Sequence, residues 1–307
     1  MSERSERPDG TSERADGTSD PGDDAWAGDR VARWLRQAEG LEVQLAPVSE
    51  VLFATAALAP GERVLDVGCG TGPTTREAAA RVGPDGSVIG LDVSAAMLEA
   101  AAAAPVPEGA APVEWVTADA VTWAPPEAAV DAVISRFGVM FFSDPPTAFA
   151  NLAAATRPGG RLAVAVWARR DESGLFAVPL HAALGVLRAH DVPVPAGLPE
   201  DGGPFSLGDG AASVALLEGA GWADAAAVSH RLDLPFGGGL PPRAAAEAAV
   251  DFGPTRVALE GLADDVVAAA VDAIAEALAG HVDGSGHVVL GGHVIVLTAT
   301  KPDPSRG

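Results

Sequence analysis

The sequence predicts an α/β protein whose parallel sheet is doubly wound, with helices on both faces. Residues 63–72 read Arg-Val-Leu-Asp-Val-Gly-Cys-Gly-Thr-Gly, an apolar run followed by three glycines at alternate positions. Over residues 63–167, short apolar runs alternate with stretches of helical periodicity, which is typical of repeated βαβ units. The 307 residues are also enough to bury a substantial core.

The chain is strongly acidic, with a formal net charge of −22. Arginine supplies all of the basic residues except Lys301, and the arginines are scattered along the chain. Such a charge repels a phosphate backbone, so we expect no nucleic-acid partner.

Cys69 is the only cysteine, which excludes an intramolecular disulfide and a metal site built from several cysteines. The N-terminus has no apolar signal core, and no apolar run approaches the roughly 18 residues of a membrane helix. We therefore expect a cytoplasmic protein without a membrane partner.

The segment before the first strand has two parts. Residues 1–24 consist almost entirely of polar residues and glycine, and they predict a disordered tail. Residues 25–60 predict N-terminal helices that cover the ligand site or pack in the core. Val31, Trp34 and Leu35 fit one helical face, and a second helix over 41–58 is interrupted near Pro47.

The glycine turn predicts the site. Glycines let the backbone bend sharply and approach a ligand, and the helix that follows points free N–H groups into the turn. A dinucleotide-binding turn would need glycine at the sixth position counted from Gly68, which is Pro73. The pattern is instead D-x-G-x-G-x-G, with Asp66 at the strand end. A nucleotide-like ligand is the expected occupant, and Cys69 is expected to serve as a small turn residue.

Further strands and helices alternate after this turn. We predict strands over residues 63–67, 87–92, 113–118, 130–135 and 161–167, and helices over 73–82, 94–104 and 145–156, with 119–129 mostly loop. Asp144 and the prolines after it indicate a helix start, and Pro158 with two glycines indicates a stop.

Polar residues follow the second, third and fourth strands, at the sheet edge where such folds bind ligands. Asp92 can accept two hydrogen bonds from a ribose diol, and Asp119 with Ala120 can meet an adenine edge. Each aspartate has a structural alternative, a helix cap for Asp92 and a turn for Asp119. Met97 can lie against a purine or pack in a helical core.

Five stretches, taken together in order, resemble the class I S-adenosylmethionine-dependent methyltransferases. They are residues 61–72, 90–98, 119–120, 135–142 and 157–160. The chain looks like the branch related to the quinone-pathway C-methyltransferases, the type 11/25-like domains, which also includes many small-molecule O-, N- and C-methyltransferases. The resemblance is clear over about residues 40–170 and looser at 203–206 and 216–222.

This resemblance implies a Rossmann-like sheet of seven strands in the order 3-2-1-4-5-7-6, with the last strand antiparallel. It implies S-adenosyl-L-methionine as cofactor and in-line transfer of a methyl group to the O, N or C atom of a small organic acceptor. Two alternatives stay open: a non-catalytic regulatory protein that binds S-adenosylmethionine, and, opposed by Pro73 and Asp66, a nicotinamide oxidoreductase. The acceptor and the oligomeric state are not predicted.

The resemblance also implies a cofactor site. Its residues are Asp66, Gly68, Cys69, Gly70, Gly72, Asp92, Val93, Met97, Asp119, Ala120, Ser135 and Arg136. Asp66, Gly68 and Gly70 are expected around the methionine portion, and Ser135 and Arg136 beside the sulfonium end. Residues 136–141 depart from the quinone-pathway enzymes.

The chain is predicted to divide into the tail, the N-terminal helices and three further parts. Residues 61–170 form the cofactor-binding core, and 171–205, with a helix over 174–190, form a lid on the acceptor side. Residues 206–301 complete the sheet. They are predicted to contain a helix over 211–220, an antiparallel edge made of strands 222–234 and 287–300, and a helical excursion over 243–252 and 262–279.

The catalytic residue is not identified by the sequence. His181, His190 and His230 are candidate bases, because histidine titrates near neutral pH. Arg136 can bind an acceptor carboxylate or phosphate, or pair with a neighbouring acid.

Two other groups of side chains have alternative interpretations. Phe137, Phe141 and Phe142 with Met140 can wall an apolar acceptor site or pack in the core. His287 and His293 are poorly spaced for a metal, and no metal site is expected.

Overall fold

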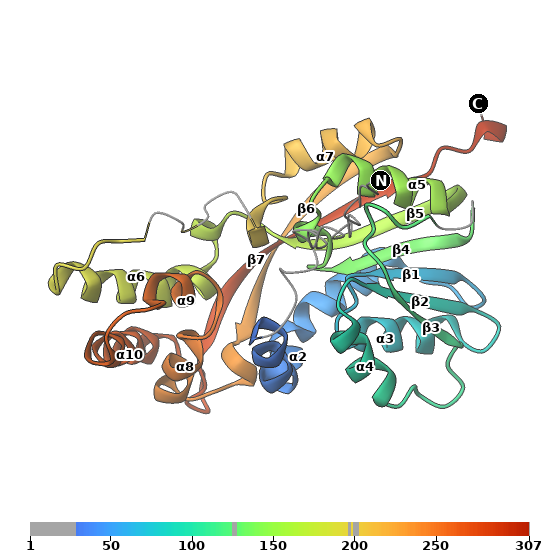
Figure 1. Ribbon diagram of the computed structural model, residues 1–307. Helices are drawn as coiled ribbons and strands as arrows, with labels where there is room; N and C mark the ends of the chain where they lie inside the picture. Colours follow the sequence, from blue (N-terminus) through green and yellow to red (C-terminus); the bar gives the residue numbers. More distant parts are fainter. Residues whose placement is uncertain (1–28, 125–127, 196–197, 199–202, 307) are drawn as a thin grey trace, which may run out of the picture.

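The computed structural model describes residues 29–124, 128–195, 198 and 203–306, and the predicted tail over residues 1–24 lies outside them. Its centre is a sheet of seven strands in the order β3-β2-β1-β4-β5-β7-β6 (Figure 1). The strands are β1 (Arg63–Val67), β2 (Ser87–Asp92), β3 (Val113–Thr117), β4 (Val130–Arg136), β5 (Thr156–Trp167), β6 (Ala223–Pro235) and β7 (Val289–Thr300). Strands β1 to β5 pair in parallel, and β7 is antiparallel to both β5 and β6. The predicted strand order and antiparallel edge are confirmed.

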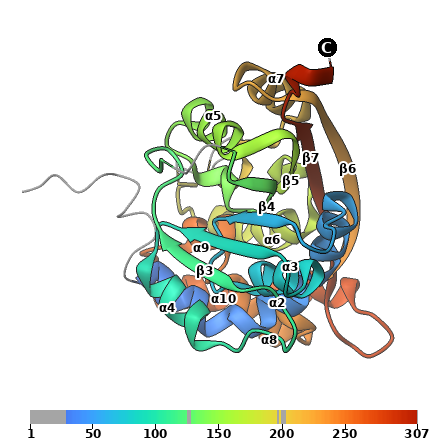
Figure 2. The same ribbon diagram turned by 90° about the vertical axis from the view of Figure 1, so that its right-hand side faces the viewer.

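Helices cover both faces of this sheet, as Figure 2 shows. Helices α2 (Asp29–Ala56), α3 (Pro73–Val82) and α4 (Ala95–Ala103) lie on one face. Helices α5 (Pro145–Ala155) and α7 (Gly210–Gly219) lie on the other. Strand β1 is buried from Val64 to Val67, as expected of a central strand covered on both sides.

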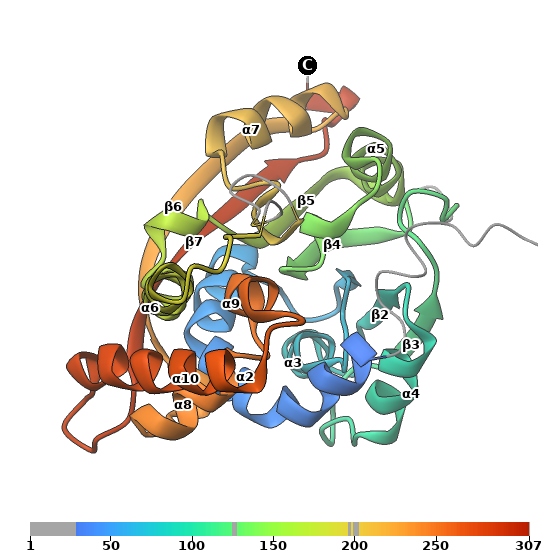
Figure 3. The ribbon, with the colours of Figure 1, turned by 60° about the vertical axis from the view of Figure 1, so that its left-hand side comes forward.

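Another group of helices lies beyond the carboxyl ends of β4 and β5. It comprises α6 (Gly174–Ala189), α8 (Pro242–Ala249), α9 (Gly253–Leu259) and α10 (Asp264–Leu278). Helix α6 packs against α9 and α10, and Figure 3 shows the three side by side. The predicted lid helix and the helical excursion are therefore one packed cluster, although they are far apart in sequence.

The N-terminal segment differs from the prediction of an interruption near Pro47. The structure has one helix, α2, which runs through this proline. On either side of it, Leu45, Val48 and Leu52 are buried in the core. Proline removes one helical hydrogen bond, but burial of a continuous apolar face outweighs that loss.

The structure differs from the prediction at two other places, the start of β5 and the helix α9. Strand β5 begins at Thr156 rather than near residue 161, and its pairing with β4 shifts register between Val130 and Ala132. The predicted Pro-Gly-Gly stop thus forms an irregular stretch within the strand. Helix α9 lies between the two predicted helical stretches of the excursion, where Pro254 occupies its first turn.

None of the helices in the described part of the chain has the length and apolar character that a membrane-spanning segment requires.

Candidate active site

A cavity of about 680 Å³ opens at the carboxyl ends of the central strands. Its walls come from the loops after β1 to β4 and from Trp167 at the end of β5. Helices α2 and α6, the turn Gly203–Phe205 and residues 251–257 of the helical excursion complete them. The volume lies within the range of about 300–1,000 Å³ that is usual for small-molecule sites.

The glycine turn forms the floor of the cavity. Gly68, Gly70 and Gly72 all have positive φ angles, of 65°, 56° and 76°. A Cβ atom on Gly68 would lie 2.5 Å from the Cα atom of Gly138, whereas one on Gly70 would meet no protein atom within 4 Å. Gly68 is therefore required by the close approach of two backbones, and Gly70 borders open space that a ligand can enter.

Asp92 joins β2 to this turn. Its Oδ2 accepts a hydrogen bond from the Gly70 amide at 2.8 Å, and its Oδ1 accepts one from the Ser94 amide at 2.9 Å. Burial raises the pKa of Asp92 above its ordinary value, and these backbone hydrogen bonds oppose the shift. The carboxylate lines the cavity, so it is available to a ligand as well as to the turn.

Asp66 lies behind the turn and is completely buried. Its Oδ2 accepts hydrogen bonds from the hydroxyl groups of Thr74 at 2.6 Å and Thr75 at 2.7 Å. Burial raises the pKa of Asp66 to about 6, although the two threonines and the charge of Arg136 lower it. Oδ1 has no hydrogen-bond partner among the described residues. A buried carboxylate oxygen left in this state is suited to a cationic ligand group.

Asp119 and Ala120 follow β3 and line the same cavity. Oδ1 of Asp119 accepts a hydrogen bond from the Val121 amide at 2.9 Å, so this aspartate forms a turn and faces the cavity at once. Val93 and the buried Met97 line the cavity beside them.

Ser135 and Arg136 end β4 and have different roles. The buried Ser135 hydroxyl donates to the Val67 carbonyl at 2.7 Å and accepts from the Gly138 amide at 3.1 Å, which ties β4 to β1. Arg136 lines the cavity and donates to Glu42 Oε1 at 2.6 Å and to Ser49 Oγ at 2.8 Å. Of the two expectations for Arg136, the structure shows the pairing with a neighbouring acid, which fixes α2 to the strand.

Most residues of the predicted cofactor site are brought together. Those that line the cavity are Gly68, Gly70, Asp92, Val93, Met97, Asp119, Ala120 and Arg136. The remaining four, Asp66, Cys69, Gly72 and Ser135, are not among the residues that line the cavity. A Cβ on Gly72 would meet the Trp115 ring at 2.4 Å, and burial raises the pKa of the Cys69 thiol. These two residues support the turn by being small and inert.

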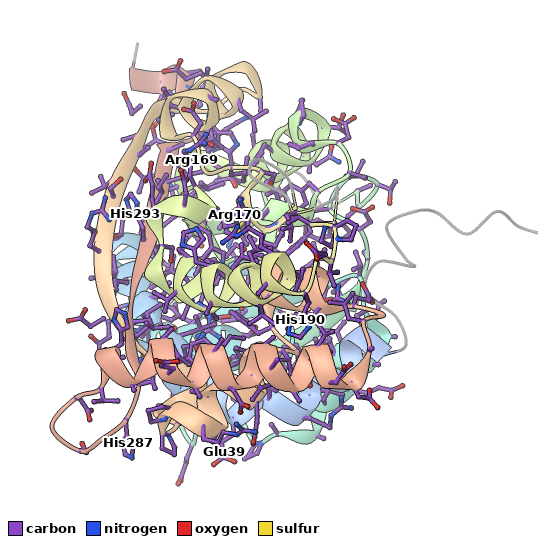
Figure 4. The ribbon with its side chains drawn as sticks, turned by 90° about the vertical axis from the view of Figure 1, so that its left-hand side faces the viewer. Glu39, Arg169, Arg170, His190, His287 and His293 are labelled. Carbon is purple, nitrogen blue, oxygen red and sulfur yellow. The ribbon has the colours of Figure 1, made fainter. Side chains whose placement is uncertain are left out.

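The candidate histidine bases are not among the residues that line the cavity. His181 lies on α6, His190 ends that helix, and His230 lies on β6. Figure 4 shows His287 and His293 far apart, consistent with their separate places along the chain. The described residues contain no group of three or more side chains arranged to hold a metal ion.

Aromatic side chains wall the other half of the cavity. The predicted Phe137, Met140, Phe141 and Phe142 line it, together with Trp167, Phe176, Phe205 and Phe252, which the prediction missed. Phe137 stacks on Trp167 with ring centroids 4.2 Å apart, and Trp167 meets Phe176 edge-on at 5.0 Å. The position of Trp167 at a strand end was a usable signal, but no local motif marks Phe252.

Phe137 has a positive φ angle of 68°, which is unusual for a residue other than glycine. Its amide donates to the Ala165 carbonyl at 2.9 Å, and this bond and the ring stack hold it in place. Such a conformation costs roughly 1–2 kcal/mol, so the surrounding structure maintains it at the cavity wall.

The cavity thus has two halves. Over β1, β2 and β3 it is lined by the glycine turn and by the carboxylates of Asp92 and Asp119, and over β4 and β5 it is lined by aromatic rings. This arrangement can hold a polar, cationic nucleotide-like molecule next to an apolar molecule.

Known proteins share this sequence pattern and fold. The model of a methyltransferase domain family matches residues 64–160. The chain is 36% identical over 134 residues to nocamycin O-methyltransferase of Saccharothrix syringae, which covers 44% of this chain and 47% of the relative. It is 37% identical over 106 residues to a ubiquinone/menaquinone biosynthesis C-methyltransferase of Ectopseudomonas mendocina, covering 34% of this chain and 41% of the relative. The chain spans less than half the length of each of these relatives.

A solved structure supports the fold alone. A protein from Anabaena variabilis, assigned as a methyltransferase of an antibiotic biosynthesis pathway, matches with a TM-score of 0.55 and 17% sequence identity. The match covers 83% of this chain and 98% of that chain.

Proposed function

We propose that this chain, whose residues 64–160 match the methyltransferase domain family, is a class I S-adenosylmethionine-dependent enzyme that methylates a small organic acceptor. The relatives named above carry out O- and C-methylation respectively. Relatedness alone therefore leaves the methylated atom open.

The observation that carries this proposal is the convergence of three strand ends on one cavity. Gly68 and Gly70 follow β1, Asp92 ends β2 and Asp119 follows β3, and all four residues line the same space. In the proposed complex, Asp92 accepts hydrogen bonds from the ribose hydroxyls, and Asp119 with Ala120 borders the adenine.

The methionine portion is assigned to the glycine turn. The turn leaves open space at Gly70, and the unpaired Oδ1 of Asp66 lies behind it. Together with Asp92, this carboxylate makes the pocket favourable to a cation. S-adenosylmethionine carries a positive ammonium and sulfonium group, so the charges of the site suit it.

When bound, S-adenosylmethionine supplies a methyl group already activated on sulfur. The protein is then required to align the acceptor and exclude water. We propose that the aromatic half of the cavity, next to Arg136, binds and aligns the acceptor. Because Glu42 balances the charge of Arg136, this arginine can lie beside a sulfonium without a large repulsion.

Isothermal titration calorimetry on the full chain tests the proposal. We expect one molecule of S-adenosylmethionine or S-adenosylhomocysteine to bind, and NADH not to bind. Failure of both adenosyl ligands to bind would contradict the proposal. Binding without release of S-adenosylhomocysteine, over a broad panel of acceptors, would instead favour a non-catalytic regulatory protein.

A further inference from the structure

The aromatic half of the cavity narrows the class of acceptor. Resting on the function proposed above, we propose that the acceptor is a flat aromatic molecule with an acidic group, and that Arg256 of α9 contacts its anion. The inference stands on three properties of the cavity wall: where the aromatic residues of the chain are placed, how their rings are oriented, and which charged groups accompany them.

The aromatic residues are concentrated at this wall. Aromatic residues make up only 5% of the chain, yet six of its nine phenylalanines and Trp167 line the cavity. The buried core elsewhere consists mainly of alanine, valine and leucine. Phe53, Phe149 and Phe236 are the three phenylalanines buried in the core elsewhere. The accumulation of the other six at one cavity points to a ligand that contacts them.

The rings that line the cavity pack against one another in parallel and edge-on pairs. Phe137 and Trp167 are nearly parallel, with 10° between their planes, and so are Phe176 and Phe252, which pack with centroids 5.7 Å apart. Phe205 meets Phe176 edge-on at 5.1 Å. Aromatic rings pair best with other rings in offset-stacked or edge-to-face geometry. A planar, aromatic acceptor makes such contacts without bending.

Arg256 supplies positive charge to the same wall. It lines the cavity beside Val257, and its Nη1 pairs with Glu260 at 2.9 Å, one turn along α9. A guanidinium has five N–H donors, so one such pair leaves donors for a second carboxylate. Arg136, the other arginine of the lining, is already bound to Glu42 and Ser49. Arg256 is therefore the better partner for an acceptor anion.

The lining offers no ordinary base to an acceptor that must lose a proton. The described lining residues include no histidine, lysine or cysteine, and the chain contains no tyrosine. Of the carboxylates, Asp92 and Asp119 lie in the polar half, and Asp251 is exposed. An acceptor whose oxygen is already ionised at neutral pH needs no base.

Methyl transfer to such an anion requires no proton to be removed. A lone pair of the acceptor oxygen forms the new O–C bond to the methyl carbon. The electrons of the breaking C–S bond return to sulfur. The sulfonium charge and the acceptor charge disappear together, and no proton is left to be removed.

The test uses three commercial probes and the full chain saturated with S-adenosylhomocysteine. 2-Naphthoate is flat and anionic, 2-naphthamide is flat and neutral, and cyclohexanecarboxylate is anionic but not flat. We expect 2-naphthoate to bind at least about tenfold more tightly than either of the others, because only it uses both the rings and the arginine. Calorimetry measures all three affinities.

Substitutions separate the two contributions. Arg256→Gln should lower the affinity for 2-naphthoate to that for 2-naphthamide and leave the latter unchanged. Phe176→Leu should weaken both naphthalene probes. Arg243→Gln is the matched control, because Arg243 also pairs with the glutamate four residues on in the same helical excursion but does not line the cavity.

The outcomes distinguish this inference from the proposed function. If S-adenosylhomocysteine binds but the three probes bind equally weakly, or if Arg256→Gln changes nothing, the acceptor class is wrong and the methyltransferase proposal stands. If S-adenosylhomocysteine itself does not bind, both proposals fall.

Discussion

Asp66 is a carboxylate in a place where burial opposes its charge. No part of it is exposed, and within the described part of the chain its side-chain hydrogen-bond donors are the hydroxyls of Thr74 and Thr75, both on Oδ2. A group that costs stability and remains half unsatisfied is typical of a functional site. We therefore expect its benefit to appear only when a cation is bound.

The stability of the protein should depend on pH through Asp66. The folded-state pKa of about 6 lies above the ordinary value of 3.8, so the folded state holds the proton more tightly than the unfolded state. The contribution of Asp66 to the free energy of unfolding is therefore largest at low pH. It falls by roughly 3 kcal/mol as the pH rises from about 4 to 6. Asp66→Asn should remove this fall and be more stable than wild type at pH 8, yet bind S-adenosylhomocysteine at least about tenfold more weakly.

Urea denaturation of both proteins at pH 4 and pH 8, with calorimetry for the ligand, measures this prediction. Identical pH dependence in wild type and Asp66→Asn would show that Asp66 is not the group that titrates.

A substitution at Gly70 tests whether the open space next to the glycine turn holds the cofactor. Gly70→Val should abolish cofactor binding while lowering stability by only about 1–2 kcal/mol, because its side chain enters the cavity and its cost is mainly the positive φ angle. Gly61→Val is the matched control: Gly61 has a φ angle of 83° and open surroundings, but it does not line the cavity. Normal cofactor binding by Gly70→Val would place the ligand elsewhere.

Asp92 combines a ligand role with a structural one. Asp92→Ala leaves the Gly70 amide without its acceptor, so we expect a stability loss of about 1–3 kcal/mol and loss of cofactor binding. Asp144→Ala removes a carboxylate that caps α5 and should cost about 1 kcal/mol without affecting the cofactor. Thermal unfolding and calorimetry compare the two, and equal effects on binding would refute the ribose assignment.

Helix α2 shows how packing against segments distant in sequence overrides the helix-breaking tendency of a proline. Pro47 predicted an interruption, yet the helix continues because its apolar face packs on the sheet and on the turn Phe236–Gly238. The Gly40 position lies so close to that turn that a Cβ would come within 2.6 Å of the Gly237 carbonyl oxygen. The partner segment is almost 200 residues away, so no reading of the local sequence reveals it.

The Arg136–Glu42 pair should hold α2 over the cavity. The Arg136 side chain is 8% exposed and Glu42 is 34% exposed, so Glu42→Gln leaves a nearly buried charge poorly balanced. We expect faster hydrogen exchange in α2 and weaker cofactor binding. Glu39→Gln, at an exposed position on the same helix (Figure 4), should change neither. Unchanged exchange in Glu42→Gln would show that the pair does not anchor α2.

For the whole molecule, the sequence predicts the polar half of the site better than the aromatic half. Asp92, Asp119 and the glycine turn each follow an apolar run, and parallel topology brings such strand ends together. Phe205 and Phe252 instead reach the cavity through loops that join helices, where neither periodicity nor a motif indicates a ligand. Their placement depends on how α6 packs against α9 and α10, which is a tertiary property.

The fold predictions are accurate where the local sequence is decisive. The predicted bounds of strands β1 to β4 agree with the structure to within one residue, because continuous apolar runs between turn residues have one reasonable interpretation. The errors at Pro47, at the start of β5 and at α9 concern proline and glycine positions, where the chain accommodates a residue that usually ends an element.

A crystal structure of the full chain with S-adenosylhomocysteine tests the central claim most directly. We predict the ribose against Asp92, the adenine beside Asp119 and Ala120, the amino acid portion over Gly68 and Gly70, and unfilled space walled by the aromatic rings. An adenosyl ligand bound elsewhere, or bound without contact to Asp92 and Asp119, would contradict the account.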